Sequence, residues 1–349
     1  MFDLNNLGWN EFFSSSFEES AAPGLLPGRV TAQEREGFRV FVESGEYPAI
    51  VTGRFHHNAH HTEDLPAVGD WVCASVHDDF VRIHSVLPRR SAIRRKMSAE
   101  RAFAAQVVAA NVDVVFITTS ANLDFNPRRI ERMLTLAWES GASPVVVITK
   151  ADLVDNADSL VAAASAVAVG VPIFAVSAPR GIGLDKLREF AAPGRTVALI
   201  GTSGVGKSTI TNYLLGRHRM RVQAQRSDDD RGRHTTTTRE LFVIPDGGCI
   251  VDTPGIRTVA LWDADDGLDA TFRDIEELAH TCRFTDCQHD SEPGCAVRDN
   301  VDGDRLAAYL KLQRELEHIQ RKSSKVEASN AKKRWKAITK QNRQRSKDR

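Results

Sequence analysis

The sequence has no long hydrophobic run and no net charge. None of its apolar runs approaches the roughly 20 residues that a membrane-spanning helix needs, which argues against an integral membrane protein. Its 46 Lys and Arg residues balance 46 Asp and Glu residues, so net charge alone indicates no particular partner. The first apolar positions are interrupted by acidic residues and follow no basic segment, unlike a secretory signal. We therefore expect a cytoplasmic protein with no membrane partner.

Cysteine is scarce as well. There are 5 in 349 residues, and three of them cluster near the C-terminal end. That distribution is typical of metal ligation in a reducing compartment and unlike a disulfide framework. The length is enough for two or three domains, each with a hydrophobic core.

The stretch GTSGVGKST, residues 201–209, organises the rest of the chain. It follows the apolar run 196–200 and precedes a short helical pattern. Its Gly-x4-Gly-Lys-Ser spacing is that of a phosphate-binding loop: the glycines let backbone N–H groups turn toward phosphates, and the next helix adds its positive N-terminal dipole. Lys207 would reach the β- and γ-phosphates and Ser208 would ligate Mg²⁺. The predicted nucleotide-binding residues of this loop are Gly201, Thr202, Ser203, Gly204, Val205, Gly206, Lys207, Ser208 and Thr209.

The loop lies in a region with an α/β pattern that begins near residue 107. Short apolar runs read as buried strands and alternate with helical patterns, which predicts a doubly wound parallel sheet. After the loop, two further runs flank the turn signal Asp246-Gly247-Gly248 and predict a hairpin. The second of them ends at Asp252, where a carboxylate on the Mg²⁺ side of a nucleotide site belongs. The expected strands are 113–119, 144–149, 172–176, 196–200, 239–244 and 249–251.

The signal for guanine would be an Asn-Lys-x-Asp turn after a strand. The chain offers Thr149, Lys150, Ala151 and Asp152 directly after PVVVI, and a Ser177-Ala178 turn after the next strand. The Asp152 carboxylate would accept hydrogen bonds from guanine N1 and N2. Thr149 departs from the expected Asn, which leaves one base contact open. We predict that these six residues, Ala178 included, bind GTP.

The order of these elements is unusual. In an ordinary GTPase the phosphate loop comes first and the base-reading turn near the end. Here the base-reading elements precede the loop, and the switch-like GRHTTTT (232–238) and DTPG (252–255) stretches follow it. A compact sheet tolerates such rejoining because its termini lie close together. We therefore predict a circularly permuted GTPase, in which Thr236 or Thr237 joins Ser208 and Asp252 at Mg²⁺ and the Gly255 N–H senses the γ-phosphate.

Beyond the switches, Cys282, Cys287, His289 and Cys295 supply three thiolates and one imidazole within a short polar stretch. This set closes a tetrahedral Zn²⁺ shell with no open position, which predicts one structural zinc. A long amphipathic helix is expected over 304–319, followed by a tail rich in Lys and Arg that contains Trp335. One aromatic ring among cations suits RNA, although a disordered tail would have the same composition.

The N-terminal quarter has an all-β pattern. Short alternating runs from residue 28 to about 88, broken by Gly and Pro, fit a small barrel of the oligonucleotide-binding (OB) type. Residues 1–20 form an aromatic-rich amphipathic segment that either docks on a later domain or packs in the core. We expect residues 88–96 to be a basic linker, either solvated or in contact with phosphate. His56, His57, His60 and His61 are expected in one loop, as a metal site or a solvated or RNA-facing surface.

At this point the chain resembles the circularly permuted, ribosome small-subunit-dependent GTPases, a family of bacterial assembly factors. The resemblance covers the LGWN segment, the small barrel, the permuted order, the RHTTTT and DTPG switches and the zinc-binding region. It implies GTP hydrolysis coupled to late maturation of the small (30S) ribosomal subunit, with binding to that subunit and its rRNA and stimulation by it. It assigns the same four zinc ligands.

One position bears on the hydrolysis step. Ile256 follows DTPG, where many GTPases carry a Gln that orients water, and an apolar side chain has no group to do so. His234, beside the switch threonines, is the available candidate, and the family resemblance points the same way. A solvent- or RNA-facing switch residue is the alternative role for His234.

These inferences give a multidomain protein, expected to be monomeric. Its predicted parts are an N-terminal segment (1–27), an OB-fold barrel (28–90), a circularly permuted GTPase domain (91–262) and an α-helical zinc-binding domain with a basic tail (263–349). Two other functions stay open at this point. One is a P-loop ATPase, and the other is an RNA-binding scaffold that holds nucleotide without significant turnover.

Overall fold

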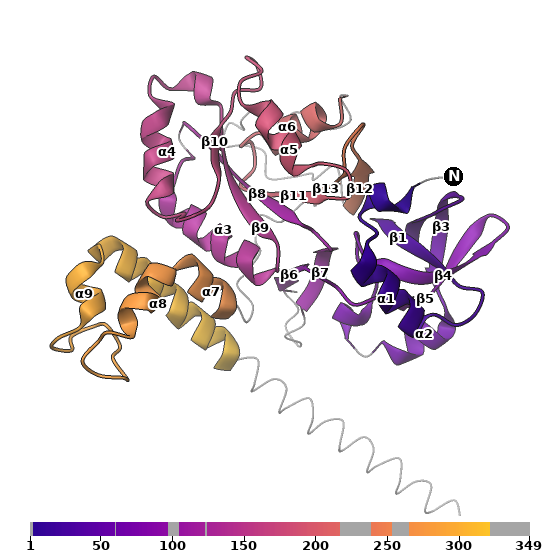
Figure 1. The fold of residues 1–349 in the computed structure, drawn as a ribbon, viewed down its shortest axis with the longest axis horizontal. Helices are drawn as coiled ribbons and strands as arrows, with labels where there is room; N and C mark the ends of the chain where they lie inside the picture. The colour runs from indigo at the N-terminus through magenta and orange to yellow at the C-terminus, as the bar shows by residue number, and fades with distance from the viewer. Residues whose placement is uncertain are drawn as a thin grey trace, which may run out of the picture.

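The computed structural model describes residues 3–59, 61–96, 105–122, 124–216, 239–252 and 265–321. Three parts are visible: a small strand-rich part at the N-terminal end, a central α/β part and a helical part near the C-terminal end (Figure 1). None of the helices in these ranges has the length and apolar character of a membrane span. The three-part fold class expected from the sequence is confirmed.

The strand-rich part is a closed five-stranded barrel. Its strands are β1 (Leu26–Gln33), β2 (Phe38–Val42), β3 (Gly45–Val51), β4 (Trp71–His77) and β5 (Phe80–Val86). Strand β3 pairs with β5 in parallel, and β1 pairs with both β2 and β4 and so closes the barrel. Alternate residues such as Val40, Val42, Val81 and Ile83 are buried in its core, as the alternating sequence pattern predicts.

The N-terminal segment packs against this barrel. It comprises the 3-10 helix η1 (Leu4–Leu7) and helix α1 (Glu11–Ser20). The ring centroids of Trp9 and Trp71 lie 4.8 Å apart at a steep angle, and Phe13 is buried beside them. Trp9, Phe13 and Phe17 therefore belong to the core around β4, one of the two roles expected for the segment, while Phe12 is exposed.

Two expectations about the barrel region were wrong. Residues 92–96 are not an open linker but strand β6 (Ala92–Lys96), which pairs with β7 (Ala105–Ala110). The guanidinium of Arg89 is occupied by Asp70, a fully buried carboxylate 2.7 Å away. His56 and His57 lie on helix α2 (Gly53–Asn58), whose N-cap is Thr52, and His60 lies outside the described residues.

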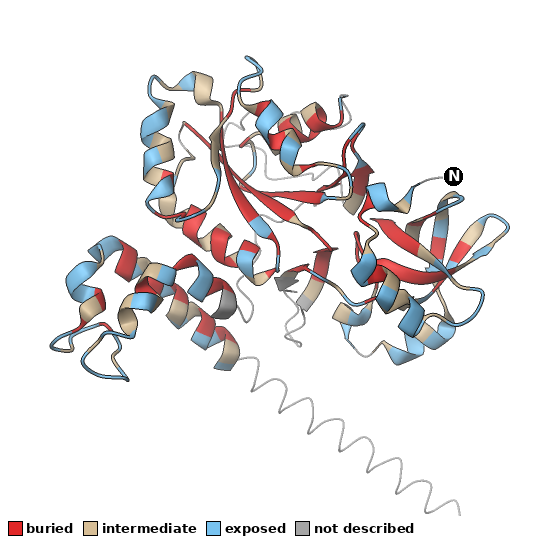
Figure 2. Cartoon of the chain, in the orientation of Figure 1, coloured by how far each residue is buried: buried red, intermediate tan, exposed pale blue. Residues whose placement is uncertain are grey.

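The central part contains the predicted parallel sheet. Its strand order is β10-β9-β8-β11-β13-β12, parallel except for the edge strand β12. The central strands are buried, and the exposed side chains gather on the surrounding helices (Figure 2). The strands are β8 (Val114–Ser120), β9 (Ser143–Thr149), β10 (Ile173–Ala175), β11 (Thr196–Ile200), β12 (Arg239–Val243) and β13 (Cys249–Asp252). The helices are α3 (Pro127–Glu139), α4 (Ala157–Ser165), α5 (Leu184–Phe190) and α6 (Lys207–Leu214).

The barrel and the central sheet are joined edge to edge, a connection that no local pattern predicted. Strand β1 pairs antiparallel with β12 through Ala32–Glu240 and Gln33–Arg239. The pairing covers the edge of β12 and makes one continuous sheet of both parts. Edge strands are commonly protected by such pairing.

The helical part has its own core. It contains α7 (Asp265–Thr271), α8 (Arg273–Ala279), α9 (Ala296–Asn300) and a helix over residues 303–321. Phe272, Ile275 and Leu316 are buried between these helices. The part packs on α3, where Arg305 bonds to the buried Glu131 at 3.1 Å and to Asp274. The expected helix over 304–319 is confirmed.

Candidate nucleotide and metal sites

The phosphate loop leaves the carboxyl end of β11 in a conformation that requires glycine. Gly201 has φ +151°, and a Cβ there would lie 2.2 Å from the backbone oxygen of Thr118 on the neighbouring strand β8. Gly206, with φ +104°, is the N-cap of α6 and turns the chain into that helix. Only glycine adopts these angles without strain at such close backbone approach. The N–H groups at the start of α6 are thereby placed at the loop, as anion binding needs.

The lysine of the loop folds back over it. Lys207 Nζ donates to the backbone oxygens of Gly201 at 2.9 Å and Thr202 at 2.6 Å. Asp252 ends β13, the strand beside β11. Burial raises the pKa of Asp252 to about 6; the charge of Lys207 acts to lower it and Glu240 to raise it. Lys207, the loop and the Asp252 carboxylate therefore meet at one edge of the sheet, which is where a Mg²⁺–phosphate group fits.

The base-reading turn and the Ser-Ala turn are also brought together. The backbone of Lys150 has φ +55°, a left-handed conformation that reverses the chain after β9. Ser177 Oγ donates to Asp152 Oδ1 at 2.6 Å, and this bond is the main cause that lowers the pKa of the Asp152 carboxyl. Asp152 therefore stays ionised and oriented, the state that accepts hydrogen bonds from guanine.

Thr149 is buried at the end of β9, beneath the phosphate loop. Its hydroxyl lies 2.5 Å from the backbone oxygen of Val205 in the loop and 3.1 Å from that of Thr119. A hydroxyl hydrogen shared between two carbonyls ties the base-reading turn to the phosphate loop. The Thr149 side chain therefore connects the base-reading turn to the phosphate loop.

A further contact at the loop has no motif in the sequence. Thr202 Oγ1 donates to Asp124 Oδ2 at 2.8 Å, and Arg129 forms an ion pair with the same carboxylate. Asp124 follows β8, whose carboxyl end lies beside that of β11. The one signal that could have found it is an acidic residue just past a buried strand.

Several predicted site residues lie outside the described part of the chain. They are His234, Thr236, Thr237 and Gly255, together with Ile256 and the tail beyond residue 321 that carries Trp335. Their predicted roles stay predictions.

The predicted metal ligands converge. Among the described residues, Cys282, Cys287, His289 and Cys295 form the group that could hold a metal ion, with ligand atoms within 4.8 Å of one another. His289 Nδ1 lies 3.7 Å from Cys282 Sγ and 3.5 Å from Cys295 Sγ, and these sulfurs are 4.0 Å apart. Tetrahedral zinc, with bonds of about 2.3 Å to sulfur and about 2.0 Å to nitrogen, puts its ligands roughly 3.5–3.8 Å apart. The spacing of the donors therefore fits zinc.

Comparisons with known proteins agree with this arrangement. A family model described as RsgA GTPase matches residues 86–262, and one described as 50S ribosome-binding GTPase matches residues 196–333. A protein of Oceanobacillus iheyensis called small ribosomal subunit biogenesis GTPase RsgA 1 is 46% identical over 90% of this chain and 92% of its own. A protein of Opitutus terrae called small ribosomal subunit biogenesis GTPase RsgA is 42% identical over 96% and 95%. This chain belongs to the RsgA GTPase family.

Solved structures confirm the fold of this RsgA-family GTPase. YjeQ from Thermotoga maritima has a TM-score of 0.64 and 26% identity over 84% of this chain and 98% of its own. YloQ, described as a circularly permuted GTPase, has a TM-score of 0.61 at 21% identity over 84% and 96%. The permuted order seen in the sequence is confirmed, and the enzyme is a GTP hydrolase. The reading as an unrelated ATPase is thereby set aside.

Proposed function

We propose that this enzyme hydrolyses GTP during late assembly of the small ribosomal subunit, and that the subunit stimulates hydrolysis. One observation carries the nucleotide part: at one sheet edge Thr149 joins the base-reading turn to the phosphate loop, and Ser177 joins the Ser-Ala turn to Asp152. The subunit part rests on relatives at 42–46% identity that are called small ribosomal subunit biogenesis GTPases. We propose a cytoplasmic monomer that contacts the rRNA of this subunit.

The residues of the loop and turns have distinct roles in this proposal. The amides of residues 201–209 and Lys207 hold the phosphates, and the Asp152 carboxylate holds guanine. Ser208, Asp252 and a switch threonine, Thr236 or Thr237, would hold Mg²⁺, which neutralises charge on the phosphates when bound. The donor set and spacing of Cys282, Cys287, His289 and Cys295 support one structural zinc. The four parts proposed for the chain keep the boundaries 1–27, 28–90, 91–262 and 263–349.

His234 is the proposed positioning group for the attacking water. Ile256 has no polar group to take that role, and His234 lies beside the switch threonines in the sequence. Binding of the subunit would bring the His234 imidazole to the water. His234→Ala should then lose most of the subunit-stimulated turnover and keep GTP and subunit binding. Full stimulated turnover in His234→Ala would show that another group acts.

The deciding experiment is a turnover measurement with four arms. Purified protein is assayed with GTP alone, with GTP and small subunits, with GTP and large subunits, and with ATP and small subunits. We expect slow GTP turnover that rises sharply with small subunits only. Stimulation by large subunits would mean that the large subunit, and not the small one, is the partner. No stimulation, with GTP binding intact, would indicate an RNA-binding scaffold that holds nucleotide without significant turnover.

A further inference from the structure

Three of the residues that line one cavity of about 190 Å³ each carry a buried polar atom without a hydrogen bond. These atoms are Arg29 Nη1, Trp71 Nε1 and Asn10 Oδ1, and within the described ranges they are the buried side-chain nitrogen and oxygen atoms that lack a partner. Arg29 is 1% exposed and Trp71 is 0% exposed. Because buried polar groups nearly always have partners, three unpaired atoms on residues that line the same space suggest a polar occupant.

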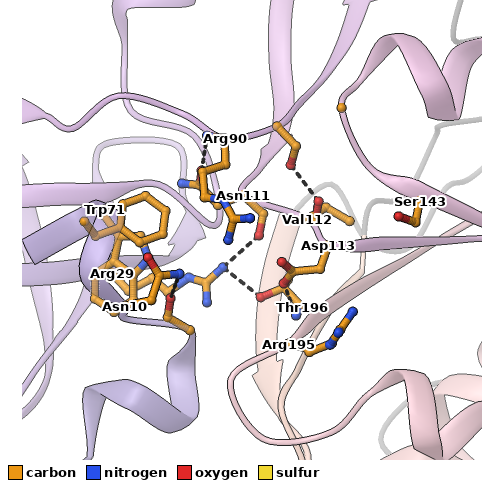
Figure 3. A pocket seen from close by; sticks show the side chains of 14 residues that line it. Asn10, Arg29, Trp71, Arg90, Asn111, Val112, Asp113, Ser143, Arg195 and Thr196 are labelled. Carbon is orange, nitrogen blue, oxygen red and sulfur yellow. Dashed lines mark hydrogen bonds between the residues drawn. The ribbon is translucent and has the colours of Figure 1, made fainter. Parts of the chain in front are cut away.

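The cavity lies where the N-terminal segment, the barrel and the central GTPase part meet. Asn10 precedes α1, Arg29 is on barrel strand β1, and Thr196 begins β11 of the GTPase sheet. Arg29 extends from the barrel to the GTPase part (Figure 3): its Nη2 donates to Thr196 Oγ1 at 2.8 Å and to the Asn111 backbone oxygen at 3.2 Å. Its Nε donates to the Gly69 backbone oxygen. These bonds fix the guanidinium and leave Nη1 as its nitrogen without a hydrogen-bond partner.

The lining is cationic. Besides Arg29, the exposed residues Arg90 and Arg195 line the cavity and mark its solvent side. The carboxylate among the lining residues is Asp113, and it accepts a hydrogen bond from the Thr196 N–H at 2.8 Å. The lining therefore contains three guanidinium groups and one carboxylate, and that carboxylate already accepts a hydrogen bond from the backbone.

Arg29 carries a buried charge without a direct counter-ion. In the described structure it forms no ion pair, and the nearest buried carboxylate on the barrel, Asp70, is paired with Arg89. Burial lowers the pKa of the Arg29 guanidinium, while Cys249, Asp113 and Asp70 act in the opposite direction. An arginine side chain keeps its proton in such surroundings. A buried unpaired charge is costly, so an anion in the cavity would stabilise it.

We propose that this cavity binds a phosphate group, either free phosphate or a small phosphomonoester. The Arg29 and Trp71 N–H groups would donate to phosphate oxygens from the buried side, and Arg90 and Arg195 would close over it from the solvent side. The Asn10 oxygen would accept the hydrogen of a monoprotonated phosphate, which explains an acceptor among the donors. The site is separate from the phosphate loop, which lies at the opposite end of β11.

Indole N–H resonances report on the site directly. The protein has 5 tryptophans, so Trp71→Phe identifies the Trp71 signal in a spectrum of ¹⁵N-labelled indoles. The protein is first saturated with GDP and Mg²⁺ so that the phosphate loop is filled, and inorganic phosphate or glycerol phosphate is then added, with chloride at matched ionic strength as the reference. We expect a saturable shift of the Trp71 signal with a millimolar or tighter dissociation constant.

Variants at the solvent side test the assignment without disturbing the core. Arg90→Ala and Arg195→Ala should each weaken binding about three- to tenfold. Arg35→Ala, an exposed arginine in the turn between β1 and β2, should leave it unchanged. Tighter binding of glycerol phosphate would assign the site to a phosphomonoester, and tighter binding of inorganic phosphate to the free anion. No saturable shift, an equal shift with chloride, or full binding by the Arg90→Ala/Arg195→Ala double variant would overturn the proposal and leave a water-filled cavity.

Discussion

The Thr149 hydroxyl lies 2.5 Å from the backbone oxygen of Val205, which links the base-reading turn to the phosphate loop. The two stretches are far apart in the chain and adjacent in space, because β9 and β11 flank β8 in the sheet. The base-reading turn and the phosphate loop are therefore held to each other directly, by this hydrogen bond.

Thr149→Val should weaken nucleotide binding without changing base preference. The change keeps the shape of the side chain and leaves the Val205 and Thr119 carbonyls without their donor, a loss of about 1–2 kcal/mol. We expect the affinities for GDP and ADP to fall by a similar factor, about tenfold. Titration of a fluorescent GDP analogue with both competitors measures this, and Thr149→Ser, which keeps the hydroxyl, serves as the control. A loss confined to guanine nucleotides would mean that Thr149 reads the base.

Asp152→Asn should change which base is bound. The carboxylate, held by Ser177 at 2.6 Å, would accept from two guanine N–H groups, whereas an amide offers one acceptor and one donor. Charged hydrogen bonds contribute about 1.5–3 kcal/mol each, so GTP affinity should fall at least about 100-fold. Xanthosine triphosphate, which presents an oxygen in place of the guanine amino group, should gain. Equilibrium competition measures both. Unchanged GTP affinity would place the base elsewhere.

Much of this architecture could be predicted because its signals are local. The runs that form β8, β9 and β11 are short, apolar and followed by turn residues, and the permuted order follows from the positions of two motifs. The four metal donors are close in sequence and needed little folding to converge.

The features that were missed depend on contacts between distant segments. The β1–β12 pairing involves two residue pairs more than two hundred positions apart. Strand β6 was not predicted because Arg94 and its basic neighbours have the composition of a solvated linker. Its buried residues Ala92 and Ile93 pair with strand β7. Asp124 reaches Thr202 only because β8 and β11 are neighbours in the sheet.

Metal removal should expose three thiols and loosen the helical part. Cys295 is the N-cap of α9, and its Sγ accepts a hydrogen bond from the Arg298 N–H at 3.3 Å. One of the four metal donors therefore also caps this helix. Without zinc, thiol reagents should modify Cys282, Cys287 and Cys295, and hydrogen exchange should increase from α8 to α9. Cys73 and Cys249, both 0% exposed in other parts of the fold, should stay unreactive.

Metal analysis should find one zinc per chain in the untreated protein. Cys287→Ser should lower the zinc content, and Cys73→Ala, the matched control, should keep it. GDP affinity, measured after Mg²⁺ has been restored, should be unchanged by zinc removal in both variants, because the phosphate loop lies on the central sheet. Equal thiol reactivity before and after chelation would argue against the metal site.

The Arg132–Glu315 pair should make the contact between α3 and the helix over 303–321 sensitive to acid. Two bonds of 2.7 Å join the guanidinium and the carboxylate, and the Arg132 hydrogen bond is the main cause that lowers the pKa of Glu315. A carboxyl with a lowered pKa stabilises the folded state above its unfolded value, about 4.3, and loses this contribution as the pH falls through the folded value. Both side chains are about one-third exposed, so the contribution should be about 0.5–1 kcal/mol.

Hydrogen exchange of the 303–321 helix at several pH values measures this contribution. At neutral pH Glu315→Gln should exchange about two- to fivefold faster than the unmodified protein, which corresponds to that free energy. As the pH falls below 4, the difference should shrink, because the unmodified Glu315 becomes protonated and resembles the glutamine. Glu317→Gln is the matched control, since Glu317 pairs with Arg321 on the exposed side of the same helix. A difference that stays constant with pH would show that the substitution acts through packing and not through the ion pair.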